Sequence, residues 1–250
     1  MDLVTVAILT KNEERHMVDV VRNAKKLTNS VLVIDCGSTD KTVELAEQEG
    51  AKVVFRAWDD DFSAQRNFAI GKVVTDYILF LDADERMDDI LIKNIKKSVA
   101  DDQCKFQYKF IEEVSAFGFH YKHGVFGPSK IVRLFPTKNV KYVNKVHERP
   151  ECNLPKKNLD GTVLHYTYRD YQHWLTKAGQ YTTIWADYKY KDGKRVNVAS
   201  PLGHCIFGFI RAYIFQLGFL DGWAGIYSSV QHSLYTWLKY IKLYEKQKSN

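Results

Sequence analysis

Two aspartates directly follow an apolar run. Asp82 and Asp84 come after residues 77–81, whose sequence is YILFL. Two acids at the mouth of a buried strand lose solvation and repel each other, so such a pair persists most easily when a cation neutralises it. Carboxylate oxygens suit Mg²⁺ or Mn²⁺, which coordinate substrate phosphates with the rest of their shell. The pattern indicates a divalent-cation site, and its alternative is a solvated loop that opens the next helix.

Further polar residues follow other apolar runs. Thr10, Lys11 and Glu13 come after one short run, and Asp35 ends the next. Ligands of parallel sheets bind beyond the carboxyl ends of the strands. We therefore expect these side chains to lie at the same sheet edge as the two aspartates.

Strand and helix patterns alternate along the first third of the chain. Short apolar runs predict strands at residues 3–9, 31–35, 51–55 and 77–81. Helical spacing predicts helices at residues 13–27, 41–49 and 64–72, capped by Asn12, by Thr39 or Asp40, and by Ser63. Strands separated by such helices imply βαβ units, and hence an α/β protein with a mostly parallel sheet.

The pattern changes after about residue 103. Strand-like segments are expected at residues 105–111, 119–121, 130–135 and 162–166, joined by loops and with few helices. We interpret them as an antiparallel addition that builds a cleft wall. From about residue 170 the pattern turns helical, and residues 223–245 carry one apolar face.

Composition places the chain among ordinary globular proteins. It has 250 residues, 45% of them hydrophobic and 26% charged, which excludes wholesale disorder. The 4 cysteines form no CxxC pair, so neither a disulfide scaffold nor a cysteine-rich zinc module is expected. The N-terminus shows no secretion signal, and we expect reduced thiols and a cytoplasmic location.

The formal charge of +6 lies entirely in the last third. Residues 1–165 hold 25 basic and 25 acidic side chains, whereas residues 166–250 hold 11 and 5, together with 19 of the 34 aromatic residues. Such asymmetry suggests an anionic partner, and the accompanying apolar runs favour a membrane surface over nucleic acid.

The longest apolar run of this last third is residues 205–220. It is shorter than the roughly 20 residues of a span and is interrupted by Arg211 and Gln216. We expect helices that lie on the bilayer, with lysines facing anionic lipid at Lys239, Lys242, Lys246 and Lys248. The alternative is that the apolar face packs against the rest of the chain or against another subunit in a homo-oligomer.

The order of the motifs resembles a known family. VAILTKNEE, then VLVIDCGSTDKT, then FLDADE, is similar to the family 2 glycosyltransferases, which have the GT-A fold. The segments FSAQRNFAI, KIVRLFP, KVHERP, GTVLHYTY and GFLDGWAGIYSSVQHSLYTWLKY resemble the subgroup of lipopolysaccharide-core β-1,4-glucosyltransferases. Cys36 departs from the pattern, because many members carry a second acid there, so Asp35 would contact the nucleotide alone or not at all.

The resemblance implies inverting transfer of a sugar, with glucose suggested by resemblance alone, from a UDP-sugar to a glycan or lipid-linked acceptor. The apolar, basic last third would place the protein on the cytoplasmic face of the membrane, and the resemblance implies a role in cell-envelope polysaccharide synthesis. Residues 1–168 would form the catalytic domain, with a nucleotide-sugar half (1–102) and an acceptor half (103–168), and residues 169–250 a helical extension. The alternatives are a non-catalytic nucleotide-sugar-binding protein or a nucleotidyltransferase, whose glycine-rich phosphate loop is missing from ILTKNEE.

The resemblance also implies roles for the polar residues. Asp84 would bind the metal directly, Asp82 would bind the ribose or a metal water, and His165 is a candidate third ligand, with a structural histidine as its alternative. Thr10, Glu13 and Asp35 would line the nucleoside pocket. The alternative for Glu13 is an acid that only stabilises a helix N-terminus, and Lys11 is either a donor contact or a solvated charge. Arg66 would meet the diphosphate or the aspartates, unless it forms a surface salt bridge. Its neighbours Gln65 and Asn67 would face the same cleft.

Inversion needs a general base opposite the leaving group. Glu148, in the segment VHERP, is the candidate, and a surface glutamate paired with Arg149 is its alternative. His147 could orient this base or the acceptor. His120 and His123 are candidates for lining the acceptor cleft.

Overall fold

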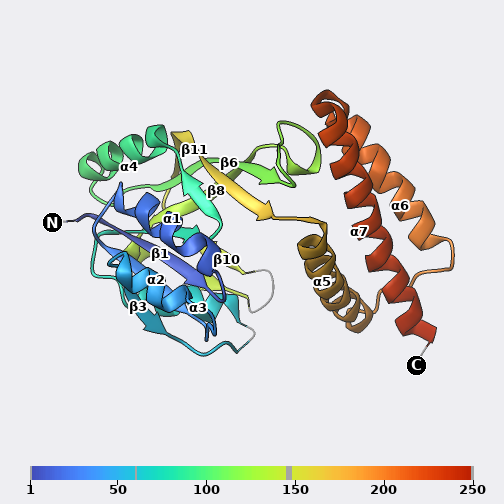
Figure 1. Ribbon diagram of the computed structural model, residues 1–250, viewed down its shortest axis with the longest axis horizontal. Coiled ribbons are helices and arrows are strands. Elements are labelled where there is room, and N and C mark those ends of the chain that lie inside the picture. Colours follow the sequence, from blue (N-terminus) through green and yellow to red (C-terminus); the bar gives the residue numbers. More distant parts are fainter. Residues whose placement is uncertain (1, 60, 145–147, 249–250) are drawn as a thin grey trace. The chain divides into compact units, whose positions relative to one another are not determined.

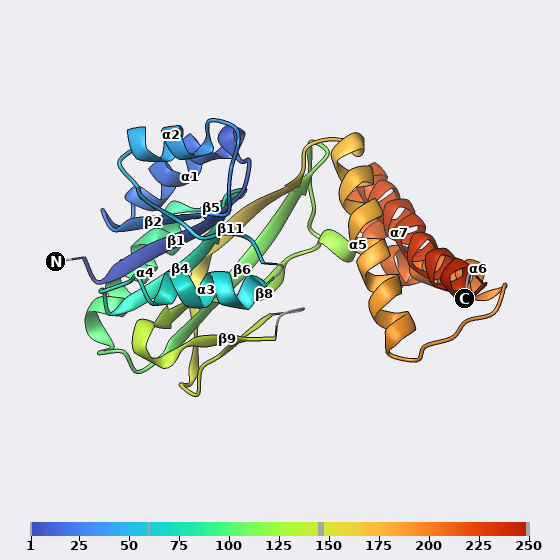
Figure 2. The ribbon, with the colours of Figure 1, turned by 90° about the horizontal axis from the view of Figure 1, so that it is seen from below.

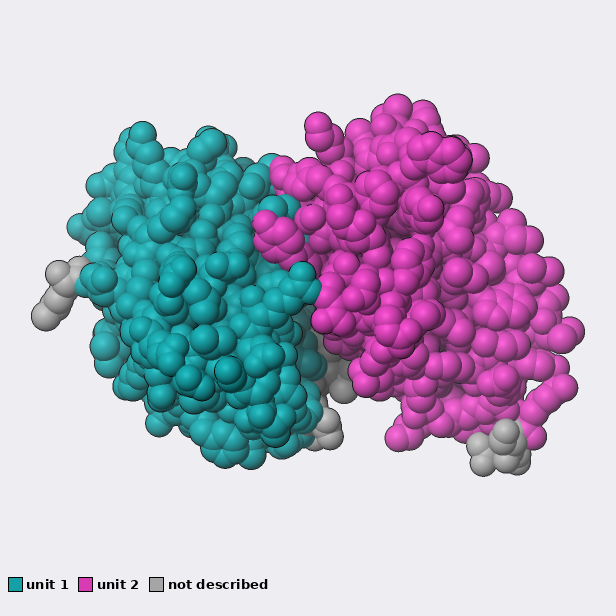
Figure 3. Space-filling view, in the orientation of Figure 1, with its two compact units in different colours: residues 1–112, 129–165 teal, residues 113–128, 166–250 magenta. Residues whose placement is uncertain are grey.

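The computed structural model describes residues 2–59, 61–144 and 148–248. The chain forms two compact units (Figure 3). Unit 1 comprises residues 1–112 and 129–165, and unit 2 comprises residues 113–128 and 166–250. The domain limits expected from the sequence stay a prediction.

The described residues form one large sheet of parallel and antiparallel strands (Figure 1). Its strand order is β3-β2-β1-β4-β8-β6-β11-β5, with β7 paired to β6, and β9 and β10 form a separate ribbon. The strands are β1 (Val4–Thr10), β2 (Val31–Asp35), β3 (Lys52–Phe55), β4 (Tyr77–Asp82), β5 (Glu85–Met87), β6 (Gln107–Ala116), β7 (Phe119–His120), β8 (Ser129–Pro136), β9 (Lys141–Val143), β10 (Arg149–Glu151) and β11 (Lys156–Tyr168).

The first four strands of this order are parallel, and β8 joins β4 antiparallel. Strands β6 and β8, and likewise β5 and β11, are also antiparallel pairs. The predicted α/β architecture, parallel strands with an antiparallel addition and C-terminal helices, is confirmed.

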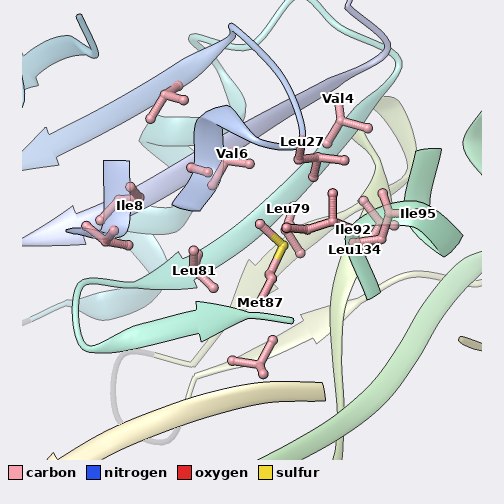
Figure 4. Close-up of a cluster of buried hydrophobic side chains, with 14 of the residues drawn as sticks. Val4, Val6, Ile8, Leu27, Leu79, Leu81, Met87, Ile92, Ile95 and Leu134 are labelled. Carbon is pink, nitrogen blue, oxygen red and sulfur yellow. The ribbon is translucent and has the colours of Figure 1, made fainter. Parts of the chain in front are cut away.

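Four helices belong to unit 1 and cover the sheet: α1 (Glu14–Lys25), α2 (Thr42–Gln48), α3 (Phe62–Ile70) and α4 (Asp89–Asp101). Alternate residues of β1 point to opposite faces of the sheet, as strand geometry requires. Val6 and Ile8 enter a core with α1 and α4, whereas Ala7 enters a core with α3. Figure 2 shows α1 and α2 on one side of the parallel strands and α3 on the other. The larger core holds the end of β4 in place, because Leu79 and Leu81 lie within it (Figure 4).

None of the three expected N-cap positions is correct: Glu13 and Lys41 are the N-cap residues of α1 and α2, although Asp40 accepts a hydrogen bond from the amide of Thr42 at 3.0 Å. Asn12 adopts a left-handed conformation with φ 56°, and its side-chain oxygen accepts a hydrogen bond from the amide of Thr39, so it ties two loops together. Asp61, not Ser63, caps α3, because its carboxylate accepts from the amide of Ala64 at 2.9 Å. Asn12 is held by a contact distant in sequence, whereas Asp61 caps α3 locally and the hydroxyl of Ser63 donates instead to the carbonyl oxygen of Asn144 at 2.7 Å.

Unit 2 contains three longer helices, α5 (Tyr171–Lys191), α6 (Ser200–Ile210) and α7 (Gly222–Lys248). It also contains the 3₁₀ turns η1 (Gly124–Phe126) and η4 (Gly218–Asp221), and the π-helix η3 (Arg211–Phe215). The 3₁₀ turn η2 (Thr137–Asn139) lies in unit 1. Helix α7 packs against both α5 and α6. Gly225 permits the close approach of η4, since a Cβ there would lie 1.6 Å from the carbonyl oxygen of Gly218.

Three lysines expected to face lipid contact α5 instead: Lys239, whose amine lies 4.5 Å from the ring centre of Trp185, together with Lys242 and Lys246. The amine of Lys242 donates to the carbonyl oxygen of Gly179 at 2.7 Å, and Lys246 pairs with Asp187. Within the described chain, no single helix has both the length and the apolar character of a membrane span, although Ser200–Phe215 and Gly218–Lys248, bent by 69°, meet those criteria together.

Candidate active site

The expected polar residues meet at one edge of the parallel sheet. Thr10 is the register partner of Asp35, and Leu9 is the register partner of Asp82. The carboxyl ends of β2, β1 and β4 are therefore side by side, which is where open α/β sheets bind ligands.

Asp82 is held between two arginines. Its Oδ2 lies 3.1 Å from Nη1 of Arg133, and its Oδ1 lies 3.6 Å from Nη2 of Arg66. Burial alone would raise the pKa of Asp82, but the charges of Arg133 and Arg66 hold it well below its usual value. Asp82 is therefore ionised and already engaged by protein cations.

Glu85, the first residue of β5, completes this pairing. It is fully buried, its Oε2 accepts from the amide of Asp82 at 2.9 Å, and its Oε1 lies 3.1 Å from Nη2 of Arg133. Burial, and next the charge of Asp82, raise the pKa of Glu85 to about 7. Neither Glu85 nor Arg133 was predicted from the sequence as a site residue. The available signal was a lone arginine inside the apolar strand KIVRLF.

Asp84 lies beside a histidine from the end of the sheet. Its Oδ2 is 3.4 Å from Nε2 of His165, while Nδ1 of His165 is 3.1 Å from Oε1 of Glu112. Burial would lower the pKa of His165, but its hydrogen bonds to Asp84 and Glu112 raise it to about 10. Glu112 was not foreseen, because a glutamate on an exposed strand edge is usually solvated. One ligand atom each from Glu85, Glu112 and His165 lie within 4.8 Å of one another.

The turn that carries Asp84 is braced by Arg86. Its guanidinium donates to the carbonyl oxygens of Ala83 and Glu85, each at 2.7 Å, and to that of His16 on α1 at 3.0 Å. These bonds join the turn between β4 and β5 to a helix of the core. The position of Asp84 is thus fixed by backbone contacts rather than by its own carboxylate.

Arg66 enters the site from α3. It is 8% exposed, and its guanidinium lies 5.1 Å from the ring centre of Phe80 and 5.2 Å from that of Tyr142. Its Nε is 3.8 Å from Oε1 of Glu148, beyond hydrogen-bond distance. Within the described ranges, Nε and Nη1 have no hydrogen-bond partner. The group is therefore positioned by aromatic rings and keeps donors available for an anion.

The neighbours of Arg66 have a structural role. Gln65 donates to the carbonyl oxygens of Arg56 and Ala57, and Asn67 exchanges two hydrogen bonds of 2.8 Å with the backbone of Tyr142. These contacts fix α3 to the adjoining loop and to β9, and so orient Arg66.

The residues expected to line the nucleoside pocket differ in burial and in hydrogen bonding. Thr10 is buried, and its hydroxyl has no hydrogen-bond partner in the part of the chain that is described. Asp35 is also buried and accepts from the amide and hydroxyl of Ser38, so it shapes its own turn. Glu13 stands at the N-cap of α1, and Lys11 is exposed. Their contact with a nucleotide stays a prediction.

Glu148 pairs with Arg66 and not with Arg149, the next residue in the chain. Its side chain is 24% exposed and forms the 3.8 Å ion pair with Arg66, whereas Arg149 pairs with Glu151 at 3.4 Å. The glutamate is thus connected through Arg66 to Asp82. His147 lies outside the described residues.

His120 and His123, the two candidates for acceptor binding, belong to unit 2. Nε2 of His120 is 2.9 Å from a carboxylate oxygen of Glu113, and Nδ1 of His123 is 2.7 Å from Oδ1 of Asp221. Asp221 also accepts from the amide of His123, so this pair closes the loop before η1. A role for them in acceptor binding stays a prediction.

Acids outnumber cations in the cluster of unit 1. Its carboxylates belong to Asp82, Asp84, Glu85, Glu112 and Glu148. The cations that form ion pairs with them, among the residues that the structure describes, are Arg66, Arg133 and His165, and Arg86 is a fourth cation in the turn that carries Asp84. Excess negative charge in a largely buried site is costly unless a cation offsets it. Carboxylate oxygens beside an imidazole are a suitable donor set for Mn²⁺ or Mg²⁺.

Comparison with known proteins identifies the class. Residues 5–154 match the family model described as glycosyl transferase family 2. The match covers more than half of the chain and includes every member of the charged cluster except His165. The protein belongs to glycosyl transferase family 2, and it is a glycosyltransferase.

Relatives resemble nearly the whole chain. An uncharacterized glycosyltransferase of Rickettsia typhi is 27% identical over 98% of this chain and 88% of its own length. The lipopolysaccharide core biosynthesis glycosyltransferase LpsC of Rhizobium meliloti is 22% identical over 96% of this chain and 91% of its own. Among solved structures, glucosyl-3-phosphoglycerate synthase from Mycobacterium tuberculosis, in complex with Mn²⁺, UDP and phosphoglyceric acid, aligns over 78% of this chain and 80% of that chain, with TM-score 0.47 and 13% identity.

Proposed function

We propose that the protein transfers a sugar from a UDP-sugar to a hydroxyl group of a glycan or lipid-linked acceptor, with inversion and with a divalent cation. The observation that carries this proposal is the excess of carboxylates at the end of β4, beside an arginine with unused donors. A nucleoside diphosphate and a divalent cation complement these two features.

Asp84 and His165 would hold the cation, Mn²⁺ or Mg²⁺. Among the described residues, His165 is the one ion-pair partner of Asp84, so the carboxylate retains lone pairs for a metal. Asp82 would contribute through a metal-bound water or the ribose, because both of its oxygens already face arginines. The bound cation would neutralise charge that develops on the departing diphosphate.

The chain's own residues supply the remaining interactions. The free donors of Arg66 would bind the diphosphate. The unpartnered hydroxyl of Thr10, together with Glu13, Asp35 and Lys11, would bind uracil and ribose. Their shared location at the carboxyl ends of β1 and β2 supports this assignment.

Glu148 is our candidate general base. It would accept the proton of the acceptor hydroxyl as that oxygen attacks the sugar carbon from the side opposite the leaving diphosphate. Its ion pair with Arg66, at 3.8 Å, supports membership of the same charged cluster.

The acceptor belongs to cell-envelope polysaccharide in this proposal, and glucose is the sugar that the sequence resemblance suggests. The name of LpsC, a lipopolysaccharide core biosynthesis glycosyltransferase, supports the acceptor class. Unit 2 would lie on the cytoplasmic face of the membrane, since large apolar side chains of α6, η3 and α7 are exposed. A homo-oligomer that covers the same side chains is the competing arrangement.

The test is thermal unfolding with UDP and Mn²⁺, followed by UDP release from a panel of UDP-sugars. UDP with Mn²⁺ should raise the unfolding midpoint by several degrees at saturating concentration. Asp84→Ala should abolish this shift, whereas Glu148→Gln should keep the shift and lower metal-dependent UDP release by roughly 10²-fold or more.

Matched controls are Asp101→Ala and Glu151→Gln, two acids outside the cluster. Both should behave like the unaltered protein. A shift that survives Asp84→Ala would remove Asp84 from the metal site, and full UDP release by Glu148→Gln would show that the base is another group.

A further inference from the structure

Unit 2 contains a cavity of about 360 Å³ that the transfer site does not use. It is lined by η1, the end of β11, α5, η3 and the middle of α7, all within this one unit. This volume lies within the range that small-molecule sites occupy.

Aromatic rings form much of its lining. Phe126, Tyr168, Trp174 and Tyr235 all line the cavity, and Phe126 and Tyr168 lie with ring centres 6.1 Å apart. Trp174 is only 4% exposed, so its position is fixed by packing. Flat aromatic faces bind the apolar C–H faces of a pyranose ring while the ring hydroxyls point toward polar groups.

The cavity also contains a buried amide that nothing in the described chain satisfies. Gln231 is 2% exposed, and neither its Oε1 nor its Nε2 has a hydrogen-bond partner. Oε1 of Gln216, another lining residue, is likewise unpartnered. Burying an unpaired amide is costly, so both groups call for a ligand with donors and acceptors. Neighbouring hydroxyl groups of a sugar offer both.

A cation lies at the same cavity. Arg211 is exposed, begins the π-helix η3, and has no carboxylate partner among the residues that the structure describes. His232, the other basic lining residue, has its pKa lowered by burial and next by the charge of Arg211, so it is neutral at pH 7. The uncompensated guanidinium favours a ligand that carries a negative group.

We propose that this cavity binds a saccharide bearing a carboxylate or a phosphate group. The ring would contact the aromatic side chains, its hydroxyls would bond to Gln231 and Gln216, and its anion would pair with Arg211. This inference goes beyond the proposed transfer, because it assigns a second site that needs neither nucleotide nor metal.

The experiment is calorimetric titration of the full chain, without UDP or metal, with glucuronic acid, galacturonic acid, glucose 6-phosphate and mannose 6-phosphate. Glucose and inorganic phosphate are the comparison ligands. At least one charged sugar should bind at least ten times more tightly than glucose and than inorganic phosphate. Arg211→Gln should reduce that affinity to the level of the neutral sugar.

Gln231→Leu should lower binding at least tenfold without lowering the unfolding midpoint, since it removes an unpaired buried amide of similar size. Arg195→Gln, which alters an exposed arginine that does not line the cavity, should bind like the unaltered protein. Asp84→Ala should also bind normally, which separates this test from that of the transfer site.

Three results would overturn the proposal. They are an absence of binding by all four charged sugars at millimolar concentration, unchanged binding by Arg211→Gln, and phosphate binding as tight as that of a sugar phosphate. The last would define an anion site without a saccharide.

Discussion

The two aspartates after β4 have different electrostatic environments. Asp82 is fixed between Arg66 and Arg133, whereas Asp84 faces only His165 among the described ion-pair partners. A carboxylate already paired with guanidinium groups has permanent cations as partners, whereas the imidazolium beside Asp84 can release its proton, which leaves the carboxylate and the neutral imidazole to bind a metal ion. We infer that Asp82 organises the site and that Asp84 binds the cation.

The metal-free protein should lose stability as pH rises. The folded-state pKa of His165, about 10, lies above the ordinary value of 6.5. Its contribution is therefore fully present below pH 6.5 and is lost as pH rises through about 10. Chelator-treated protein should show a midpoint that falls by several degrees over this window, measured by thermal unfolding at each pH.

His165→Gln should flatten this decline relative to the unaltered protein. The comparison is made as a difference between the two proteins, because Cys36 and Cys104 have raised pKa values and also titrate at alkaline pH. Parallel curves for the two proteins would contradict the assignment of the positive charge to His165.

Part of this site was predictable from the sequence. Asp82, Asp84 and Asp35 end apolar runs, and parallel strands bring such ends together. Arg133 and Glu112 were not predictable, because a charged residue on a strand is normally assigned to solvent. Their burial depends on the pairing of β6 with β8, which no local pattern specifies.

At the scale of elements, the short strand β5 holds the site together. It is three residues long, and its antiparallel pairing with β11 places Glu85 opposite His165. Strand β11 approaches α4 closely at Gly161, where φ is 110° and a Cβ would lie 2.3 Å from the amide nitrogen of Leu91. The position of His165 thus depends on a glycine four residues earlier.

Gly161→Ala should destabilise unit 1 by about 2–5 kcal/mol, because it adds both backbone strain and a clash with main-chain atoms. Denaturant unfolding measures the change. Gly71→Ala is the matched control, since φ at Gly71 is −66° and the nearest atom to a Cβ is 3.5 Å away. That control should be neutral or slightly stabilising, and equal losses in both variants would refute the close-approach argument.

The main elements of the parallel half were predictable, because strands β1 to β4 and helices α1 to α3 have clear local periodicity. Strand β5 was not, since the three residues Glu85–Met87 show no alternation and are ordered by the pairing of Val163 with Met87. Strand β11 proved longer than the expected residues 162–166 for the same reason: partners distant in sequence extend it.

At the scale of the whole molecule, apolar side chains are exposed mainly on unit 2. Phe215 is 71% exposed and Trp223 is 75% exposed. Contiguous exposed apolar residues on a protein surface indicate a partner or a membrane. The proposed membrane role therefore depends on side chains of η3 and α7 rather than on the lysines that bind α5.

Replacing Phe215 and Trp223 by serine should lower binding to vesicles of anionic lipid by roughly tenfold or more, because each large side chain contributes about 1.5–3 kcal/mol when buried. Co-sedimentation with the vesicles measures this. The control pair, Phe55→Ser and Val74→Ser, alters residues of unit 1 that are 63% and 98% exposed. Equal sedimentation of both double variants would rule out this surface as the anchor, and loss of self-association would instead support the oligomer.

Unit 2 is assembled from two separate stretches of chain, residues 113–128 and 166–250. Tyr121 of the first stretch is buried beside Ala224, about a hundred residues later in sequence. During synthesis on the ribosome, residues 113–128 are made before residues 166–250, the stretch against which they pack. All residues of unit 1 have been made by residue 165. We therefore expect a nascent chain stopped near residue 165 to expose the apolar side chains of residues 113–128, and to be prone to aggregation until the last third is made.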